Sequence, residues 1–215
     1  MTLKSTIIPV TPLHQNCTLF WCSDTLKAVV IDPGGDMNVI LKAIDQAGAN
    51  VEKILLTHGH FDHVGGAMDL AESLDVPIVG PHKDDAYLLQ AVVSTGQMYG
   101  IEGGRDVVGN SWLKDGDHVT FGTVTLDVFH TPGHTPGHLV YYANDGQLAQ
   151  VGDVLFRGSI GRTDFPRGDL KTLVKSITEK LWPLGPDVTF IPGHGRTSTF
   201  GRERNNNPYV GDKVI

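Results

Sequence analysis

The sequence predicts an α/β fold of four layers, in which two β-sheets pack face to face and helices cover both outer faces. Strands are followed by helices, and the same order then repeats in the second part of the chain. The 26 glycines and 12 prolines lie in short turns rather than in one low-complexity tract, which favours many short strands and tight loops. No linker interrupts the sequence, so we expect one domain over residues 1–215.

The first half of the chain begins as a meander of short strands, and the turn Asp32-Pro33-Gly34-Gly35 ends the third of them. Apolar residues at helical spacing then predict a helix that ends near Gly48. The predicted elements are strands over Ser5–Val10, Cys17–Cys22 and Lys27–Asp32, a helix over Asp36–Gly48, a strand over Glu52–Thr57, a loop over His58–His63, a helix over Val64–Leu74, a strand over Val76–Val79 and a helix over Lys83–Ala91.

The segment Val92–Trp112 contains five glycines and shows no period, so we expect a long irregular excursion in the position of a lid. Strands and one amphipathic helix then return. The predicted elements are strands over His118–Phe121, Val124–Phe129, His138–Ala143 and Leu148–Val151, a helix over Asp169–Trp182, a strand over Asp187–Ile191 and an irregular segment over Pro192–Ile215.

Composition limits the classes of partner and compartment. The formal net charge of −7 disfavours general attraction to nucleic acid, so we expect no nucleic-acid partner. No stretch approaches the roughly 18 apolar residues of a membrane span, and the N-terminus lacks the apolar run of a secretory signal. Cys17 and Cys22 lie an odd number of residues apart in one predicted strand, which puts them on opposite faces and disfavours a disulfide. These features fit a cytoplasmic protein without membrane contact, and they leave the oligomeric state open.

The charge is uneven along the chain. Residues 1–152 hold 7 Lys and Arg against 17 Asp and Glu, whereas residues 153–204 hold 9 against 6. Two interpretations fit the basic segment: a solvated helix face, or a positive rim for a small anionic substrate.

The run His58-Gly-His60-Phe-Asp62-His63 places three histidines and one aspartate within six residues, directly after a predicted strand. Imidazole nitrogen and carboxylate oxygen are the ligands that zinc and iron take in proteins. Residues two apart in an extended loop point the same way, so His58 and His60 can bind one ion, and Asp62 and His63 can face a second. Four such residues side by side would be costly without a cation, and the run therefore predicts a metal site.

One short loop cannot supply all the ligands of a metal site, so we expect the other ligands at the ends of other strands. Each candidate follows an apolar strand and lies beside Gly or Pro, where a rigid sheet positions functional groups. Taken alone, each candidate is also an ordinary turn residue. The candidates are His134 and His138 in the run Thr131–His138, Asp153 after Leu148–Val151, and His194 after Val188–Ile191.

In order and spacing, His58-x-His60-x-Asp62-His63, His134, Asp153 and His194 resemble the metallo-β-lactamase superfamily over nearly the whole chain. Gly152-Asp153-Val-Leu-Phe156 and Gly161-Arg162 resemble glyoxalase II (hydroxyacylglutathione hydrolase) more narrowly. The resemblance implies the αββα sandwich and two divalent metal ions, Zn²⁺ first, with Fe or Mn as alternatives. It assigns His58, His60 and His134 to one metal, Asp62, His63 and His194 to the other, and Asp153 to a bridge between them.

The resemblance implies hydrolysis of a small anionic thioester, such as S-lactoylglutathione to lactate and glutathione, by a hydroxide that bridges the metals. Asp62 would orient that hydroxide and accept a proton. Asp153 stands where several β-lactamases carry Cys, which argues against antibiotic hydrolysis. The sequence ends soon after His194, so we expect a short form without the C-terminal helical domain that holds glutathione in longer glyoxalase II enzymes. Arg157, Arg162 and Arg196 can replace some of those contacts, and they equally fit structural or surface arginines.

A second activity is implied by Gly161-Arg162-Thr163-Asp164-Phe165, which resembles the persulfide dioxygenases of the same superfamily. Those enzymes use one iron held by two histidines and a carboxylate, which His58, His134 and Asp153 can supply.

Asp32 either orients a ligand loop or only forms its Asp-Pro-Gly turn, and His138 begins the next strand or supports a ligand. We expect the remaining histidines to lie outside the site: His14, His82, His118 and His130.

Overall fold

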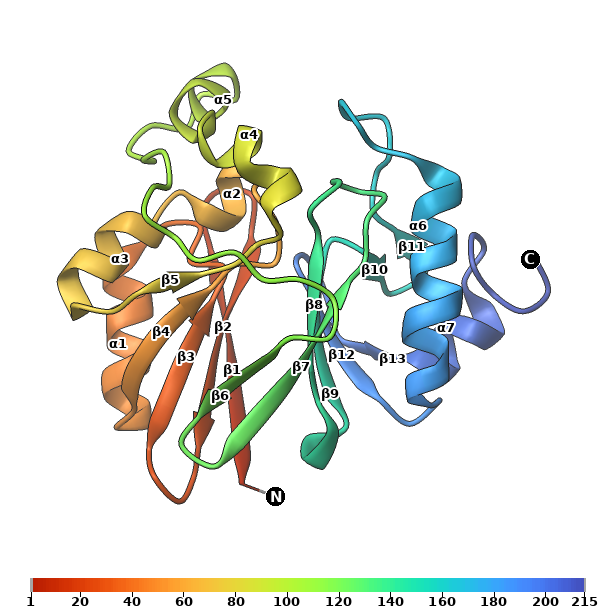
Figure 1. Cartoon of the computed structure of the whole chain (residues 1–215), viewed down its shortest axis with the longest axis horizontal. Helices are drawn as coiled ribbons and strands as arrows, with labels where there is room; N and C mark the ends of the chain where they lie inside the picture. Colours follow the sequence, from red (N-terminus) through yellow and green to blue (C-terminus); the bar gives the residue numbers. More distant parts are fainter. Residues whose placement is uncertain (1, 215) are drawn as a thin grey trace.

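The computed structural model describes residues 2–214, which form two large β-sheets packed face to face with helices on both outer sides, and one small two-stranded sheet (Figure 1). The predicted αββα sandwich is therefore confirmed. None of the helices within residues 2–214 has the length and apolar character needed to cross a membrane.

The first part of the chain builds one sheet and the helices that cover it. Its elements are β1 (Leu3–Val10), β2 (Gln15–Cys22), β3 (Lys27–Ile31), α1 (Met37–Ala47), β4 (Asn50–Leu55), α2 (Phe61–Val64), α3 (Ala67–Leu74), β5 (Ile78–Val79), the 3₁₀ turn η1 (Lys83–Asp85), α4 (Ala86–Leu89) and α5 (Val92–Met98).

The second part builds the other sheet and its helices. Its elements are β6 (His118–Phe121), β7 (Val124–His130), β8 (Leu139–Ala143), the 3₁₀ turn η2 (Asn144–Gly146), β9 (Leu148–Gly152), β10 (Leu155–Phe156), β11 (Ser159–Ile160), α6 (Leu170–Ser176), its π-helical continuation η3 (Ile177–Leu181), the 3₁₀ turn η4 (Trp182–Leu184), β12 (Thr189–Pro192), β13 (Ser198–Thr199) and α7 (Phe200–Asn206).

Strand order brings the ends of several strands to one rim. The first sheet has the order β1-β2-β3-β4-β5, with β3, β4 and β5 parallel. The second sheet has the order β13-β12-β9-β8-β7-β6, with β9 and β12 parallel. Parallel strands end at the same edge, so the segments after β3 and β4 lie together, as do those after β9 and β12.

Three apolar clusters separate the four layers. Ile40 and Ile44, four residues apart on α1, pack with Leu70 of α3 against the outer face of the first sheet. Between the sheets lie Phe20, Val29, Ile31 and Leu55 from one side and Phe121, Leu126, Tyr141 and Ile191 from the other. Leu173, Ile177 and Phe200 pack against Val140 and Phe190 on the far face of the second sheet.

The cysteines follow the predicted alternation. Cys17 lies in the cluster under α1 and Cys22 in the cluster between the sheets, and both are free thiols. The expectation of opposite faces and no disulfide is confirmed.

Three segments differ from the prediction. The stretch Val92–Trp112 is not wholly irregular, because α5 forms over its first residues with Val92 buried against the first layer. The helix expected over Val64–Leu74 is divided by Gly65-Gly66, and its first turn begins inside the histidine run at Phe61.

The C-terminal segment Pro192–Ile215 was expected to be irregular, and this prediction is wrong for much of its length. It carries β13 and α7, and the Thr199 side chain caps α7 by accepting a hydrogen bond from the Arg202 backbone N–H. The buried Phe200 side chain then fastens α7 to the outer face of the second sheet.

Candidate metal centre

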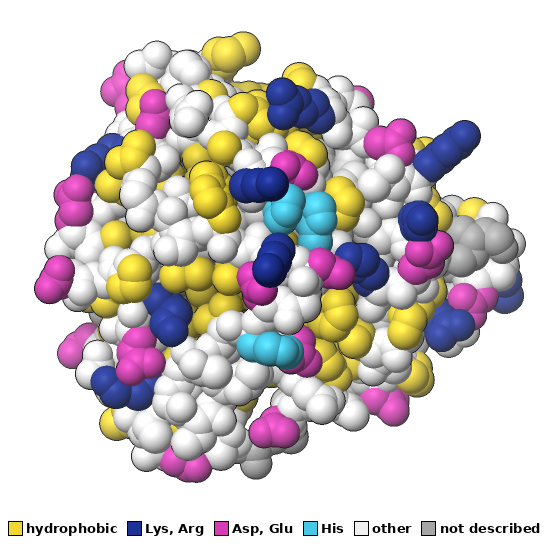
Figure 2. Space-filling view, viewed as in Figure 1, with side chains coloured by type: hydrophobic (Ala, Val, Ile, Leu, Met, Phe, Trp, Pro, Cys, Tyr) yellow, Lys and Arg dark blue, Asp and Glu magenta, His cyan; other side chains and the backbone are white. Residues whose placement is uncertain are grey.

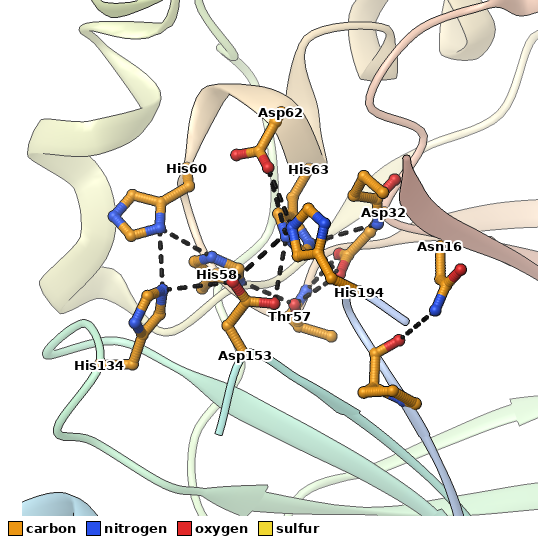
Figure 3. Close-up of polar contacts among 12 residues, drawn as sticks. Asn16, Asp32, Thr57, His58, His60, Asp62, His63, His134, Asp153 and His194 are labelled. Atoms are coloured by element: carbon orange, nitrogen blue, oxygen red, sulfur yellow. Dashed lines mark hydrogen bonds and ion pairs between the residues drawn. The ribbon is translucent and has the colours of Figure 1, made fainter. Parts of the chain in front are cut away.

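All seven predicted ligand side chains lie together at the rim where the ends of the two sheets meet (Figure 3). Most of them directly follow the end of a strand, and the others lie on the short helix α2. His58 and His60 follow β4, Asp62 and His63 lie on α2, His134 follows β7, Asp153 follows β9 and His194 follows β12.

His58, His60 and His134 form the first group. His60 Nδ1 lies 3.0 Å from His58 Nε2 and 3.0 Å from His134 Nε2. The three rings are nearly perpendicular to one another, with interplanar angles of 82°, 87° and 76°. A lone pair lies in the plane of its ring, so three mutually perpendicular rings can direct their nitrogens at one point. This arrangement fits three imidazole ligands of a single ion.

Asp62, His63 and His194 form the second group. Asp62 Oδ2 lies 3.2 Å from His194 Nε2 and 3.9 Å from His63 Nε2, and the two rings are inclined at 73°. Asp153 lies between the groups, with Oδ1 at 3.4 Å from His63 Nε2 and Oδ2 at 3.6 Å from His134 Nε2. The donors thus lie in two neighbouring groups with a carboxylate between them, and Asp32, His58 and His63 make a third possible set.

The outer nitrogens of the histidines face hydrogen-bond acceptors. His134 Nδ1 donates to the Arg162 carbonyl at 2.7 Å, and His194 Nδ1 donates to the Leu13 carbonyl at 3.2 Å. These acceptors fix the proton on the outer nitrogen and leave the inner nitrogen as a lone pair. Metal-binding histidines are typically held in this way.

Asp32 holds two further histidines. Its buried carboxylate accepts hydrogen bonds from the Thr57 backbone N–H at 2.7 Å, from Thr57 Oγ1 at 2.5 Å and from His63 Nδ1 at 2.9 Å. Because the Thr57 hydroxyl donates to Asp32, it accepts from His58 Nδ1 at 3.0 Å. Asp32 therefore does more than form its Asp-Pro-Gly turn, because it also contacts Thr57 and His63.

The charges of the site call for a cation. Burial lowers the pKa of His58 well below its ordinary value, and burial together with His134 lowers the pKa of His60 to about 3. Burial also lowers the pKa of His63, but the carboxylates of Asp153 and Asp62 outweigh it and raise that pKa well above its ordinary value. These carboxylates therefore attract positive charge, and a divalent ion can supply it.

Two buried atoms point to the same conclusion. Within residues 2–214, His63 Nε2 and Asp153 Oδ1 have no hydrogen-bond partner. A buried polar atom without a partner is costly, and both atoms face the space between the two groups of donors. The residues present thus fit divalent metal ions.

His138 lies beside the site in a supporting position. Its ring stacks on that of His58 at 17°, so the two rings cannot aim their lone pairs at one ion. Its Nε2 instead accepts a hydrogen bond from the Asp153 backbone N–H at 3.0 Å. His138 directly precedes β8 and helps to place Asp153.

The other histidines lie outside this cluster. His82 and His130 come together with Asp84, but their rings are stacked at 20° with centroids 4.2 Å apart, which prevents their lone pairs from converging. His118 forms an exposed pair with Asp127 at 2.9 Å, and His14 is exposed.

Three buried polar residues contact the site that the sequence did not single out. Gln15 Nε2 lies 3.3 Å from His63 Nδ1, Asn16 contacts the segment around His194 (Figure 3), and Asp85 contacts the loops of His60 and His134. Gln15 and Asn16 begin β2 with two buried polar side chains, and nothing in the sequence alone marks them as contacts of the site. Asp85 lies in an unremarkable Lys-Asp-Asp run.

A cleft of about 410 Å³ adjoins Asp62. It is lined by Phe61, α5 and the glycine-rich turns at Gly34-Gly35 and Gly103-Gly104, so the segment expected as a lid borders the site. Its lining includes the carboxylates of Asp36, Asp69 and Glu102 but no Lys or Arg.

The three candidate substrate arginines fall in two places. Arg157 and Arg196 line a hollow together with Arg202, whereas Arg162 extends over the Phe165 ring at 4.5 Å and pairs with Asp164 at 2.8 Å. Phe165 packs edge-on against His60, so Arg162 lies at the border of the first group. On the face shown in Figure 2, Lys and Arg side chains alternate with acidic ones instead of forming a stripe.

Comparison with known proteins identifies the family and agrees with the fold. A sequence profile of the metallo-β-lactamase superfamily matches residues 10–194. The chain is 41% identical over 208 residues to hydroxyacylglutathione hydrolase GloC of Haemophilus influenzae, covering 96% of this chain and 98% of that protein. The crystal structure of TTHA1623 in a di-iron-bound form is 35% identical with a TM-score of 0.87, covering 95% of this chain and 99% of that one. That of the BLEG-1 B3 metallo-β-lactamase is 33% identical with a TM-score of 0.89, covering 96% and 99%. The chain belongs to the metallo-β-lactamase superfamily.

Proposed function

We propose that the protein hydrolyses a glutathione thioester, such as S-lactoylglutathione, to a hydroxy acid and glutathione. The observation that carries the proposal is the meeting of seven His and Asp side chains in two adjacent groups. The relative hydroxyacylglutathione hydrolase GloC, similar over nearly the whole chain, supports this substrate class.

His58, His60 and His134 would hold one divalent ion, Asp62, His63 and His194 a second, and Asp153 would contact both. We propose Zn²⁺, with Fe or Mn as alternatives, since His and Asp ligands suit all three. Such ions, when bound, make water a nucleophile near neutral pH and polarise the carbonyl of the substrate.

Asp62 is the catalytic side chain of this proposal. Its carboxylate lines the cleft beside the two groups of donors, where it can orient the attacking water and accept a proton. No separate acid is required for the leaving group, because a thiol has a pKa near 8.5 and departs readily as a thiolate. A thioester therefore suits this site better than an ester or amide with a poorer leaving group.

The charged side chains differ between the cleft next to Asp62 and a second hollow of the molecule. The cleft next to Asp62 is acidic, whereas Arg157, Arg196 and Arg202 line a hollow in the segment that follows Asp153 and His194. We propose that Arg157 and Arg196, with Arg162 at the border of the first group, contact the carboxylates of glutathione, because guanidinium groups bind carboxylates in paired hydrogen bonds.

The test is a thiol-release assay on purified protein reconstituted separately with Zn²⁺, Mn²⁺ and Fe²⁺. S-lactoylglutathione should be hydrolysed much faster than a short thioester that lacks the glutathione carboxylates. A chromogenic β-lactam serves as a comparison, because one similar structure is that of a B3 metallo-β-lactamase. Failure to hydrolyse any glutathione thioester in all three metal forms would refute the proposed function.

Persulfide dioxygenation is the alternative activity, and it needs only His58, His134, Asp153 and one iron. The ligand side chains fit either activity, and the relative hydroxyacylglutathione hydrolase GloC supports hydrolysis. Oxygen uptake on glutathione persulfide by a protein holding one iron would reverse this preference.

A further inference from the structure

Two buried polar residues, Asp85 and Asn16, hold the backbone of different ligand segments, and neither touches an imidazole ring. Asp85 lies on η1 and is fully buried, and Asn16 lies on β2 and is 4% exposed. Each comes from the first part of the chain and contacts ligand segments of the second part.

Asp85 joins the two loops that carry the first group of histidines. Its Oδ2 accepts from the Gly59 backbone N–H at 3.0 Å and from Thr135 Oγ1 at 2.8 Å, and its Oδ1 accepts from the Gly137 backbone N–H at 2.6 Å. Gly59 separates His58 from His60, and Thr135 follows His134. One carboxylate thus fixes the distance between the two loops whose nitrogens meet at 3.0 Å.

The sequence leaves room for this carboxylate. A Cβ atom at Gly137 would lie 2.6 Å from the Asp85 backbone N and 2.7 Å from its carboxyl carbon. A Cβ atom at Gly59 would lie 2.7 Å from Leu88 Cβ on the adjoining helix. Side chains at either position would push η1 and α4 away, so the close approach depends on both glycines.

Asn16 holds the segment of the second group in the same manner. Its side-chain amide donates to the carbonyls of Pro192 at 3.0 Å and of Gly195 at 2.9 Å, on either side of His194. Figure 3 shows one hydrogen bond of Asn16 beside His194. Its backbone N–H donates to the Gly193 carbonyl at 2.7 Å. Three hydrogen bonds from one residue therefore fix the turn that presents His194.

We propose that the two metal positions are organised by separate positioning residues: Asp85 for the position of His58, His60 and His134, and Asn16 for the position of Asp62, His63 and His194. This inference rests on the two positions of the proposed function. Its consequence is that either position can be weakened without the other, because the contacts of Asp85 and Asn16 do not overlap.

Asp85→Asn is the informative change at the first position. Both carboxylate oxygens accept backbone N–H groups, so an amide must turn its NH₂ toward one of these donors and break that contact. Thr135→Val is a milder second variant that removes one donor and keeps the side-chain shape. Asn16→Ala removes both side-chain contacts around His194.

The experiment measures Co²⁺ affinity of metal-free protein in two backgrounds, His194→Ala, which retains the first position, and His60→Ala, which retains the second. Binding is followed by visible absorption, which reports the ligands of the ion. In the His194→Ala background, Asp85→Asn should weaken binding about 10- to 100-fold and Thr135→Val should weaken it less, while Asn16→Ala should have no effect. In the His60→Ala background, Asn16→Ala should weaken binding and Asp85→Asn should not.

General destabilisation would weaken both positions together, so the opposite selectivities are the decisive result. Three results would overturn the proposal. The first is an equal loss of Co²⁺ affinity at both positions for either variant, and the second is no loss of affinity for Asp85→Asn and Asn16→Ala. The third is binding of only one Co²⁺ per unmodified chain. The titration needs no substrate. Absence of thioester hydrolysis would therefore refute the proposed function and leave this test intact.

Discussion

Replacing Asp32 by Asn should reverse the proton positions on His63 while leaving the shape of the buried site unchanged. In the structure, Asp32 accepts three hydrogen bonds, from the Thr57 backbone N–H, from Thr57 Oγ1 and from His63 Nδ1. If the amide oxygen of Asn keeps the Thr57 backbone N–H, its NH₂ group faces His63 Nδ1. In the neutral ring, the form that can bind a metal, that nitrogen must then accept, so the single proton moves to His63 Nε2.

The size of the effect follows from this change. The proton on Nε2 would point at Asp153, 3.4 Å away, and would occupy the lone pair that the second metal position needs. We expect metal affinity at that position to fall about 10- to 100-fold, the usual range for a residue that supports a metal ligand. Thr57 Oγ1 and His63 Nδ1 both donate to Asp32 Oδ2, so the NH₂ group displaces two hydrogen bonds to a charged acceptor, each worth about 1.5–3 kcal/mol in the free energy of unfolding. Asp32→Ala removes all three hydrogen bonds and should destabilise the protein more.

Metal titration, thermal unfolding and ¹⁵N NMR of the histidine rings test the reasoning together. The exposed Asp24 serves as the control, because Asp24→Asn removes the same charge in the turn between β2 and β3, away from the site. Wild-type affinity at both positions in a folded Asp32→Asn protein, with His63 Nε2 still unprotonated, would show that Asp32 does not set the tautomer.

Three further outcomes are expected. Asp62→Asn should retain the fold but lower kcat for S-lactoylglutathione about 100-fold or more, and near-normal kcat would remove Asp62 from its catalytic role. The double variant Arg157→Ala/Arg196→Ala should raise KM for the glutathione thioester but not for a short neutral thioester, and an equal rise for both would disconnect the hollow from the substrate. Burial raises the pKa of Asp85 from 3.8 to about 6, so the metal-free protein should lose stability as pH rises from about 4 through 6, by up to about 3 kcal/mol for this group. Asp85→Asn should flatten that slope in chemical-denaturation curves, and parallel curves for the two proteins would contradict the assignment.

Much of the fold could be predicted because the apolar pattern carries it. The spacing of Ile40 and Ile44 predicts α1, and Gly48 closes it in the left-handed conformation, as expected. The failures occur where structure depends on distant partners. α7 forms because Thr199 caps it and Phe200 is buried, and neither fact is visible in a polar segment rich in Asn and Arg.

The candidate donors were predictable because each follows an apolar strand, and because their order along the chain is that of a known family. Their supporting contacts were not, because those contacts join segments far apart in the chain. Asp85 and Gly137 are 52 residues apart, and Asn16 and Gly195 are 179 apart. A buried carboxylate that binds backbone N–H groups and one distant hydroxyl leaves no local pattern, whereas Asp32, at the end of a strand, already suggested a role.

The donors are shared between the two sheets in a way that affects assembly. His58, His60, Asp62 and His63 belong to the part before α5 ends, and His134, Asp153 and His194 belong to the part after β6 begins. Cutting the chain in the connection between these elements would yield two fragments, each with one sheet and an incomplete set of donors. An ion bound at the junction would be held by side chains of both fragments. The affinity of the fragments for each other would therefore increase as the metal concentration rises.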